Sequence, residues 1–456
     1  MQAKTDNHRL LFETELENMI NLEHPLVKLA QQIGWATFEE QFGVLYDEGI
    51  GRPAKPIRLM VGLQYLKYTF NFSDEQLVYT WIENPYWQYF CGEKYFRHKL
   101  PIDPTSMTKW RNRVKDSGLE TLLEETIKAG LEMKVIKKAD TQKLVVDTTV
   151  QEKNITFPTD AKLCFKAREK LVDLASVLGI KLRQTYRRLA KQALVMQSRY
   201  AKSRKFGQAK KEQKKLKNFL GRVVRDIENK IGDDLFLRLE FSELLDIAKN
   251  IYTQTKNSKN KTYSIHEPDV QCIAKGKAHK KYEFGCKAGF VTTAKNCFVV
   301  GAMAFEGNPF DGHTLRKNLS QTKRFLGVEQ LGDVYVDEGY KGHDCEDIAD
   351  VTVVKRGWRK KKRSEKRWLK RRSSIEPTIG HLKQDNRLCR NYLKGIKGDK
   401  ANAILSACGY NMRKLLRKFI FALIYWWQIM KDIAKFKIMH QLRVCSENCV
   451  NGHRNS

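Results

Sequence analysis

Apolar residues recur every three or four positions along the first part of the chain, which is the spacing of one helix face. The stretch SDEQLVYTWI opens with Ser73 and has Gln76 three residues later, the pattern of a capping box. PAKPIRLMVGLQYLKYTF and DPTSMTKWRNRV show the same helical spacing. We therefore predict an all-helical domain over residues 1–137, with three short helices joined by tight turns in a helix-turn-helix-like arrangement.

The period changes at KLVVDTTV, residues 143–150, where apolar and β-branched residues predict a buried strand. Asp147 lies at its centre. An ionised carboxylate in such a strand costs several kcal/mol unless it is paired or binds a cation. Two explanations stay open: Asp147 binds a cation, or its carboxylate accepts hydrogen bonds from backbone amides at the end of the strand.

Helical spacing and many basic residues return between residues 160 and 255. We predict an inserted antiparallel helical hairpin or small bundle over residues 161–261, including a polar linker, with a lysine-rich turn near Phe206–Lys217. Such charges commonly form a solvated face. The charge of the whole chain makes DNA contact an equal alternative.

Strand patterns resume after the linker. KKYEFGCKAGFVTT and CFVVGAMAFEG predict a hairpin, DGHTLRKNLSQTKRFL a helix, and DVYVDEGY and VTVVKRG two more strands. A further helix starts near Ser374. Together with the first strand, these elements predict a mixed α/β domain over residues 138–160 and 262–425, interrupted by the helical insertion. FIFALIYWWQIM, residues 419–430, is too short to span a bilayer and predicts a buried helix, and residues 426–456 form a C-terminal tail.

The chain has 84 Lys and Arg against 52 Asp and Glu, a formal net charge of +32 over 456 residues. Such an excess predicts a polyanionic partner, with nucleic acid as the default and an acidic membrane as the competitor. No amino-terminal signal is visible. The ten cysteines contain no CxxC pair, which indicates a cytosolic protein. In the tail, Cys445, Cys449 and His453 could bind a metal only with a fourth ligand such as His440, and a polar tail without metal is the alternative.

Two further carboxylates stand out. Asp337 ends a predicted strand just before Glu338, which should point to the opposite face, and the turn residue Gly339. Glu376 lies in RRSSIEPTIGHLKQDNR, residues 371–387, where Pro377 restricts it to the first turn of a helix. Ser373 and Glu376 match a capping box, which is the structural alternative to a functional role. On the same helix face follow Gly380, Lys383 and Arg387.

Two aspartates from strands and one glutamate from a helix form a ligand set for two Mg²⁺ ions, which prefer carboxylate and phosphate oxygens. Two such ions about 4 Å apart can activate a water or a 3′-hydroxyl and stabilise the leaving oxygen in phosphoryl transfer. The sequence thus predicts a metal site at Asp147, Asp337 and Glu376.

VVDTTV, VYVDEGY and RRSSIEPTIGHLKQDNR resemble the three catalytic motifs of bacterial insertion-sequence DDE transposases, specifically the IS-five-like group. The glutamate motif of that group runs Tyr, two residues, Arg, three residues, Glu, six residues, Lys. Arg372, Glu376 and Lys383 stand in this register, whereas Leu369 fills the tyrosine position. HEPD, KGKAHKKYEFGCK and EGNPFDGHTL, and residues from Pro25 to Val114, also resemble the family.

The resemblance implies a ribonuclease-H-like catalytic domain with Asp147, Asp337 and Glu376 binding two Mg²⁺ ions, for which Mn²⁺ can substitute. It implies a bacterial, nucleoid-associated cytoplasmic enzyme that moves an element with terminal inverted repeats. Lys383 and Arg372 would hold double-stranded DNA near the scissile phosphate. A homodimer or larger assembly is expected in the active complex, since two DNA ends must meet.

Other DNA contacts are predicted from charge. The basic stretch KRGWRKKKRSEKRWLKRR, residues 355–372, would clamp the backbone. Its Trp358 and Trp368 either stack on unpaired bases or pack under the sheet. The remaining predicted contacts are Arg387 and, on the last helix of the first domain, Lys109, Arg111 and Arg113.

Two rival functions remain open. A nuclease of the same fold would use the same carboxylates without strand transfer, and inverted repeats flanking the gene would distinguish the two. A catalytically silent, domesticated DNA-binding protein is the second rival, and the complete set of three carboxylates argues against it.

Overall fold

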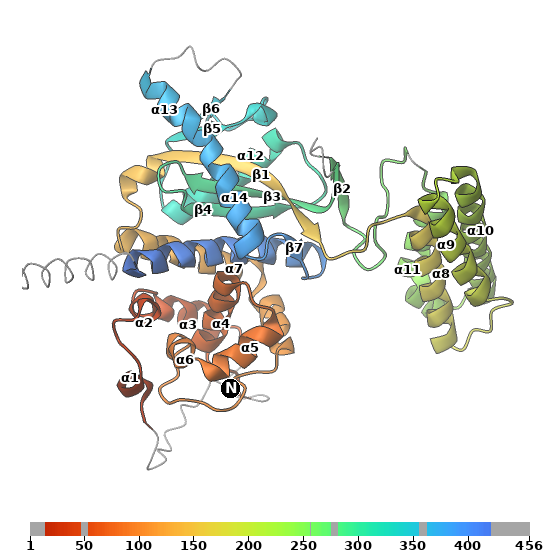
Figure 1. The fold of residues 1–456 in the computed structure, drawn as a ribbon, viewed down its shortest axis with the longest axis horizontal. Helices are drawn as coiled ribbons and strands as arrows, with labels where there is room; N and C mark the ends of the chain where they lie inside the picture. The colour runs from red at the N-terminus through yellow and green to blue at the C-terminus, as the bar shows by residue number, and fades with distance from the viewer. Residues whose placement is uncertain (1–13, 47–52, 256, 275–280, 355–362, 421–456) are drawn as a thin grey trace, which may run out of the picture.

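The structure is a computed structural model that describes residues 14–46, 53–255, 257–274, 281–354 and 363–420 (Figure 1). Within these ranges, no helix is long and apolar enough to cross a membrane. The predicted buried helix of residues 419–430 lies outside the described residues beyond Ile420, as do Trp358, Cys445, Cys449 and His453.

The amino-terminal part is helical, as predicted. Its helices are α1 (Leu16–Met19), α2 (Pro25–Ala30), α3 (Trp35–Gly43), α4 (Ile57–Phe70), α5 (Asp74–Glu83), α6 (Pro85–Phe90) and α7 (Thr105–Glu132). The Ser73 capping box forms, with the Ser73 side chain accepting from the Gln76 backbone N–H and the Gln76 side chain accepting in return. Helix α7 is broken at Lys115, whose backbone has φ 59° and ψ −171°.

A mixed sheet is built around one long central strand, β1 (Lys143–Lys153), which follows the turn η1 (Lys138–Gln142). The other strands are β2 (Gln271–Ala274), β3 (Tyr282–Thr293), β4 (Val299–Phe305), β5 (Asp333–Val336), β6 (Asp350–Val353) and β7 (Arg390–Asn391). On one side of β1 the strands β3 and β4 run antiparallel to their neighbours, and on the other side β5 and β6 run parallel to β1. The short strand β2 pairs with β3, and β7 pairs with the end of β1.

Helices cover the sheet. Helix α12 (Asp311–Leu326) packs against β3 and β4. Helix α13 (Arg363–Arg371), the turn η4 (Arg372–Ser374) and helix α14 (Ile375–Asp385) follow one another, and α14 crosses the sheet from α13 towards β7 (Figure 1). A last helix, over residues 395–420, lies between the sheet and the amino-terminal helices (Figure 1).

One continuous apolar core joins these parts. It includes Phe38 and Leu122 from the amino-terminal helices, Phe298 beside the sheet, and Leu405 and Cys408 from the last helix. The last helix lies so close to α4 that a Cβ added to Gly409 would lie 2.4 Å from the Tyr68 carbonyl oxygen. The amino-terminal helices and the sheet are therefore held in a fixed relation.

The insertion forms a helical bundle with its own core. It comprises α8 (Asp160–Val177), α9 (Arg187–Lys202), α10 (Phe206–Ile231) and α11 (Leu235–Thr253), and it lies to one side of the sheet (Figure 1). The lysine-rich turn predicted near Phe206–Lys217 is wrong, because these residues are the first turns of α10. Ala209, Leu216 and Leu220 are buried at helical spacing, so the lysines between them belong to the outer face of a helix.

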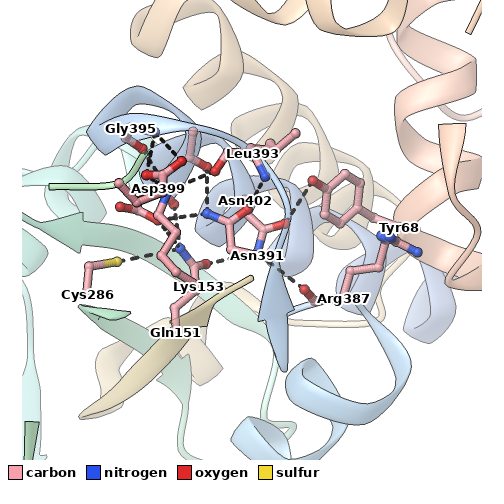
Figure 2. A network of polar contacts seen from close by, with 12 residues as sticks. Tyr68, Gln151, Lys153, Cys286, Arg387, Asn391, Leu393, Gly395, Asp399 and Asn402 are labelled. Carbon is pink, nitrogen blue, oxygen red and sulfur yellow. Dashed lines mark hydrogen bonds and ion pairs between the residues drawn. The ribbon is translucent and has the colours of Figure 1, made fainter. Parts of the chain in front are cut away.

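A buried polar network ties the far end of β1 to the carboxy-terminal segment (Figure 2). The Lys153 side chain is 3% exposed, and its Nζ lies 3.0 Å from Asp399 Oδ1 and 3.2 Å from Glu267 Oε2. The same ammonium donates to the carbonyl oxygens of Leu393, at 2.7 Å, and Gly395, at 3.1 Å. Every charge in the cluster thus has a partner of opposite sign or a hydrogen bond.

Amides extend this network to the amino-terminal helices (Figure 2). The Asn391 side chain donates to Asp399 Oδ1 at 2.7 Å, and Asn402 donates to Gln151 Oε1 at 3.0 Å. The Tyr68 hydroxyl donates to Asn402 Oδ1 at 3.0 Å. Strands β1 and β7, helix α4 and the last helix are therefore fastened at one point.

We expect Lys153→Met to lower the free energy of unfolding by about 3–5 kcal/mol, because it leaves two buried carboxylates without their counter-ion. Urea denaturation followed by tryptophan fluorescence measures this, since no tryptophan lies in the insertion and the signal reports the main core. Lys317→Met, at an exposed position of α12, is the control and should change little. Equal stability of the two variants would contradict the role given to the network.

Candidate functional site

Parallel pairing of β1 with β5 brings Asp147 and Asp337 together. The register joins Val145 to Tyr335, and each aspartate lies two residues further along the chain, Asp337 directly after β5, so both side chains share one face. Asp337 directly follows β5 and caps the turn η2 (Glu338–Tyr340), its Oδ1 accepting from the Gly339 N–H at 2.9 Å. The side chains of Asp147 and Asp337 are 17% and 39% exposed, which leaves both accessible.

Glu376 lies in the first turn of α14, as predicted, and the alternative of a capping box with Ser373 does not form. The Ser373 hydroxyl donates instead to the Lys370 carbonyl oxygen at 2.9 Å. Helix α13 and the turn η4 run directly into α14, so preceding carbonyl groups are available and the start of α14 needs no side-chain cap. The Glu376 side chain is 59% exposed.

Arg372 joins the three carboxylates. Its Nη1 lies 3.0 Å from Glu376 Oε1, and its Nη2 lies 3.0 Å from Asp337 Oδ2 and 3.5 Å from Asp147 Oδ2. The guanidinium is 19% exposed. Three acidic side chains from distant segments therefore reach one cation, which is the arrangement expected of residues that share a positively charged ligand.

Acidic residues near Asp337 in the sequence face other partners. Asp333 pairs with Lys143, and Asp344 accepts from Arg316 Nε at 3.0 Å. Glu338 is exposed, and its carboxylate lies 4.0 Å from Lys341 Nζ. Among these four acids, Asp337 is the one that contacts Arg372.

A fourth carboxylate, Asp311, adjoins the site and was not singled out from the sequence. Its Oδ1 accepts from the Thr148 hydroxyl at 2.7 Å and from Lys287 Nζ at 2.9 Å. Burial, and after it the negative charges of Asp147, Asp311 and Asp337, raise the pKa of Tyr340 well above its usual value. The sequence signal was weak, since an acid in the first turn of a helix is common for electrostatic reasons alone.

The three basic residues predicted on α7 differ in their surroundings. Arg111 is buried, and its guanidinium lies 2.8 Å from Asp74 Oδ2. Burial, and after it the Arg111 charge, lowers the pKa of the adjacent Lys67 to about 8. Lys109 and Arg113 are exposed. Arg111 thus serves the packing of α4, α5 and α7, and we retain only its two neighbours as candidate DNA contacts.

The remaining predicted DNA contacts lie around α14. Trp368 is half-buried against Val145 and Tyr335, as in the packing alternative, and Lys143 Nζ lies 5.1 Å from its ring centre. Leu369, at the position where the family resemblance expects tyrosine, is buried in the same cluster. Lys383 is half-buried on α14.

Arg387 is the last of the predicted DNA contacts. It follows α14, and its guanidinium donates to the Asn71 carbonyl oxygen at 3.1 Å.

The donor set fits a hard divalent cation in its chemistry, since it offers carboxylate oxygens from three segments. Among the described residues, no three acidic, histidine or cysteine side chains close around one point tightly enough to hold a metal. The Arg372 guanidinium lies between the carboxylates instead. A metal would fit this site only when the guanidinium moves away.

Comparison with known proteins identifies two matching families. Residues 14–113 match the model of a transposase domain (DUF772), and residues 251–412 match that of the transposase DDE domain. An uncharacterised protein of Rhizobium meliloti, ORF8 in the nfe locus, is 48% identical over 196 residues, which cover 43% of this chain and 94% of that protein. No solved structure matches.

Asp337 and Glu376 fall inside the matched DDE segment, and Asp147 precedes it, separated by the inserted bundle. The two family matches follow one another along the chain, the first over the amino-terminal helices and the second over most of the sheet and helix α14. The chain belongs to the DDE transposases of insertion sequences and is an enzyme of the polynucleotidyl transferase and endonuclease class.

Proposed function

We propose that this transposase binds the terminal inverted repeats of its element and catalyses metal-dependent DNA cleavage and strand transfer, with Asp147, Asp337 and Glu376 as the metal ligands. One observation carries the assignment: these three carboxylates all contact the Arg372 guanidinium. Side chains that share a cation in the free protein are positioned to share a divalent cation with a phosphate.

The fold supports this proposal. Strands β4, β3 and β1 are antiparallel neighbours, and β5 and β6 continue the sheet in parallel to β1. This is the order expected of the ribonuclease-H-like domain that the family resemblance implies. The aspartates lie on its two adjacent central strands, and Glu376 reaches them from a helix that crosses the sheet (Figure 1).

Two Mg²⁺ ions, or Mn²⁺ in their place, would lower the charge on the scissile phosphate and on the attacking and leaving oxygens. The chain's own residues would position the DNA. Arg372 and Lys383, four residues before and seven residues after Glu376, would bind phosphates on either side of the carboxylates. Lys109 and Arg113 on α7 would contact the DNA backbone further away, consistent with a helical DNA-binding domain.

We expect Asp337→Asn and Glu376→Gln to lower cleavage and strand joining at least about a hundredfold, because each removes negative charge from the site that would hold the metal. The assay uses linear DNA carrying the ends of the insertion sequence that encodes this chain, with Mg²⁺. Glu338→Gln is the matched control, because this neighbouring acid does not contact Arg372 in the structure.

Equal loss in Glu338→Gln, or full activity in the first two variants, would contradict the assignment. Cleavage by the unaltered protein without any joining would favour the nuclease alternative. Neither cleavage nor joining, with DNA binding intact, would favour a silent DNA-binding protein.

The position of Arg372 generates a second prediction. We expect Arg372→Gln to bind Mn²⁺ roughly tenfold more tightly than the unaltered protein in the absence of DNA, because the guanidinium and the metal compete for the same carboxylates. Electron paramagnetic resonance of free Mn²⁺ measures the affinity without any activity assay.

Arg413→Gln is the control for this measurement, since Arg413 pairs with Asp385, at 2.9 Å, away from the three carboxylates. Its Mn²⁺ affinity should match that of the unaltered protein. Unchanged or weaker binding in Arg372→Gln would show that the guanidinium does not occupy the metal position.

A further inference from the structure

A second basic site lies at the opposite end of α14 from Glu376. A cavity of about 670 Å³ opens between the first turns of α7 and the segment that follows β7. One wall is a single face of α7, with Thr108, Asn112 and Lys115, and the other wall includes Lys394 and Lys397. We propose that this cavity binds the phosphodiester backbone of the DNA strand on which the carboxylates act.

The charges of the cavity favour an anion. Lys115, Lys394 and Lys397 are exposed, and none of them forms an ion pair with any residue in the described ranges. The acid of the lining, Asp116, already pairs with Lys400 at 2.9 Å. Three ammonium groups from two walls therefore face a common space without protein counter-ions, and a polyanion would supply them.

The wall that carries Lys394 and Lys397 is held in place from beneath by the buried network (Figure 2). Lys153 donates to the Leu393 and Gly395 carbonyl oxygens, and Glu267 Oε2 accepts from the Gly395 N–H at 3.0 Å. The Asn391 side chain donates to the Gly398 carbonyl oxygen at 3.3 Å. A segment fixed by buried charges presents its lysines in one arrangement, which reduces the entropy lost when a ligand binds.

The opposite wall contains the break in α7. Lys115 adopts a positive φ of 59° inside the helix, a conformation that costs about 1–3 kcal/mol in a residue other than glycine and persists only when the surroundings enforce it. The kink lies at the cavity, next to the Asp116–Lys400 ion pair that joins α7 to the last helix. The strained residue is thus one of the three lysines that face the ligand space.

A line of basic and aromatic groups connects the cavity to the carboxylates. Helix α14 carries Glu376 at its start, and after its end the Arg387 guanidinium lies 5.9 Å from the ring centre of Tyr392, which lines the cavity and is 60% exposed. The 11 residues of α14 span about 16 Å. Along β1, Asp147 and Lys153 are about 20 Å apart.

These lengths correspond to about five or six base pairs of duplex, at 3.4 Å per pair. A DNA strand held at Glu376 could therefore continue along α14, past Lys383 and Arg387, into the cavity. A free phosphate ion would contact only part of this row of basic residues, whereas a DNA strand carries one phosphate per nucleotide along it. This inference rests on the proposed function for the identity of its ligand.

The test compares Lys394→Gln/Lys397→Gln with Lys317→Gln/Lys323→Gln, a control that removes the same charge from α12. Binding of a fluorescein-labelled 30-base-pair duplex and of a 30-residue oligothymidine is measured over a range of salt concentrations. We expect the cavity variant to bind at least one of them roughly ten- to thirtyfold more weakly at 0.15 M salt, with a salt slope smaller by about 2. The DNA form that loses affinity identifies whether the strand enters paired or unpaired.

An equal loss in the control variant, or no loss in the cavity variant, would overturn the inference. Asp337→Asn separates this result from the proposed function, because it should keep DNA binding and lose cleavage. If the cavity variant binds DNA normally and Asp337→Asn is inactive, the catalytic assignment is supported and the proposal that DNA binds in the cavity is contradicted.

Discussion

The pairing of β1 with β5 in parallel is the constraint from which the site follows. Register and alternation place Asp147 and Asp337 side by side on one face, and helix α14 brings Glu376 to the same place. Three carboxylates so close together would repel one another, and the Arg372 guanidinium offsets that repulsion with contacts to all of them. The three carboxylates are therefore already organised around a positive charge.

The far end of β1, where Lys153 lies, holds several elements of the protein together. Lys153 anchors the segment after β7 through buried ion pairs, and Asn402 and Tyr68 carry the connection to the amino-terminal helices. Buried ion pairs are weak evidence for net stability, yet breaking one is costly, so they favour a single arrangement of the parts that they join. In this protein those parts are strand β1, the basic segment of Lys394 and Lys397, and helix α4.

Local patterns predicted much of this structure. The Ser73 capping box, strand β1, the β3–β4 hairpin and helix α12 follow from apolar periodicity and turn residues, and the three carboxylates follow from their positions at a strand centre, a strand end and a helix start. The errors arose where distant contacts override a local pattern. Arg111 is buried because Asp74 supplies its counter-ion, and Ser373 does not cap α14 because α13 precedes it directly. The short strands β2 and β7 are similarly defined by their neighbours, since neither has enough residues for a pattern of its own.

The central claim is that Asp147, Asp337 and Glu376 share a cation site that Arg372 fills in the absence of metal. Anomalous diffraction from crystals of the protein soaked in Mn²⁺ tests it most directly. We predict a manganese peak contacted by the two aspartates, with the Arg372 guanidinium withdrawn from them. Manganese bound elsewhere, or bound here while Arg372 keeps all three of its contacts, would contradict it.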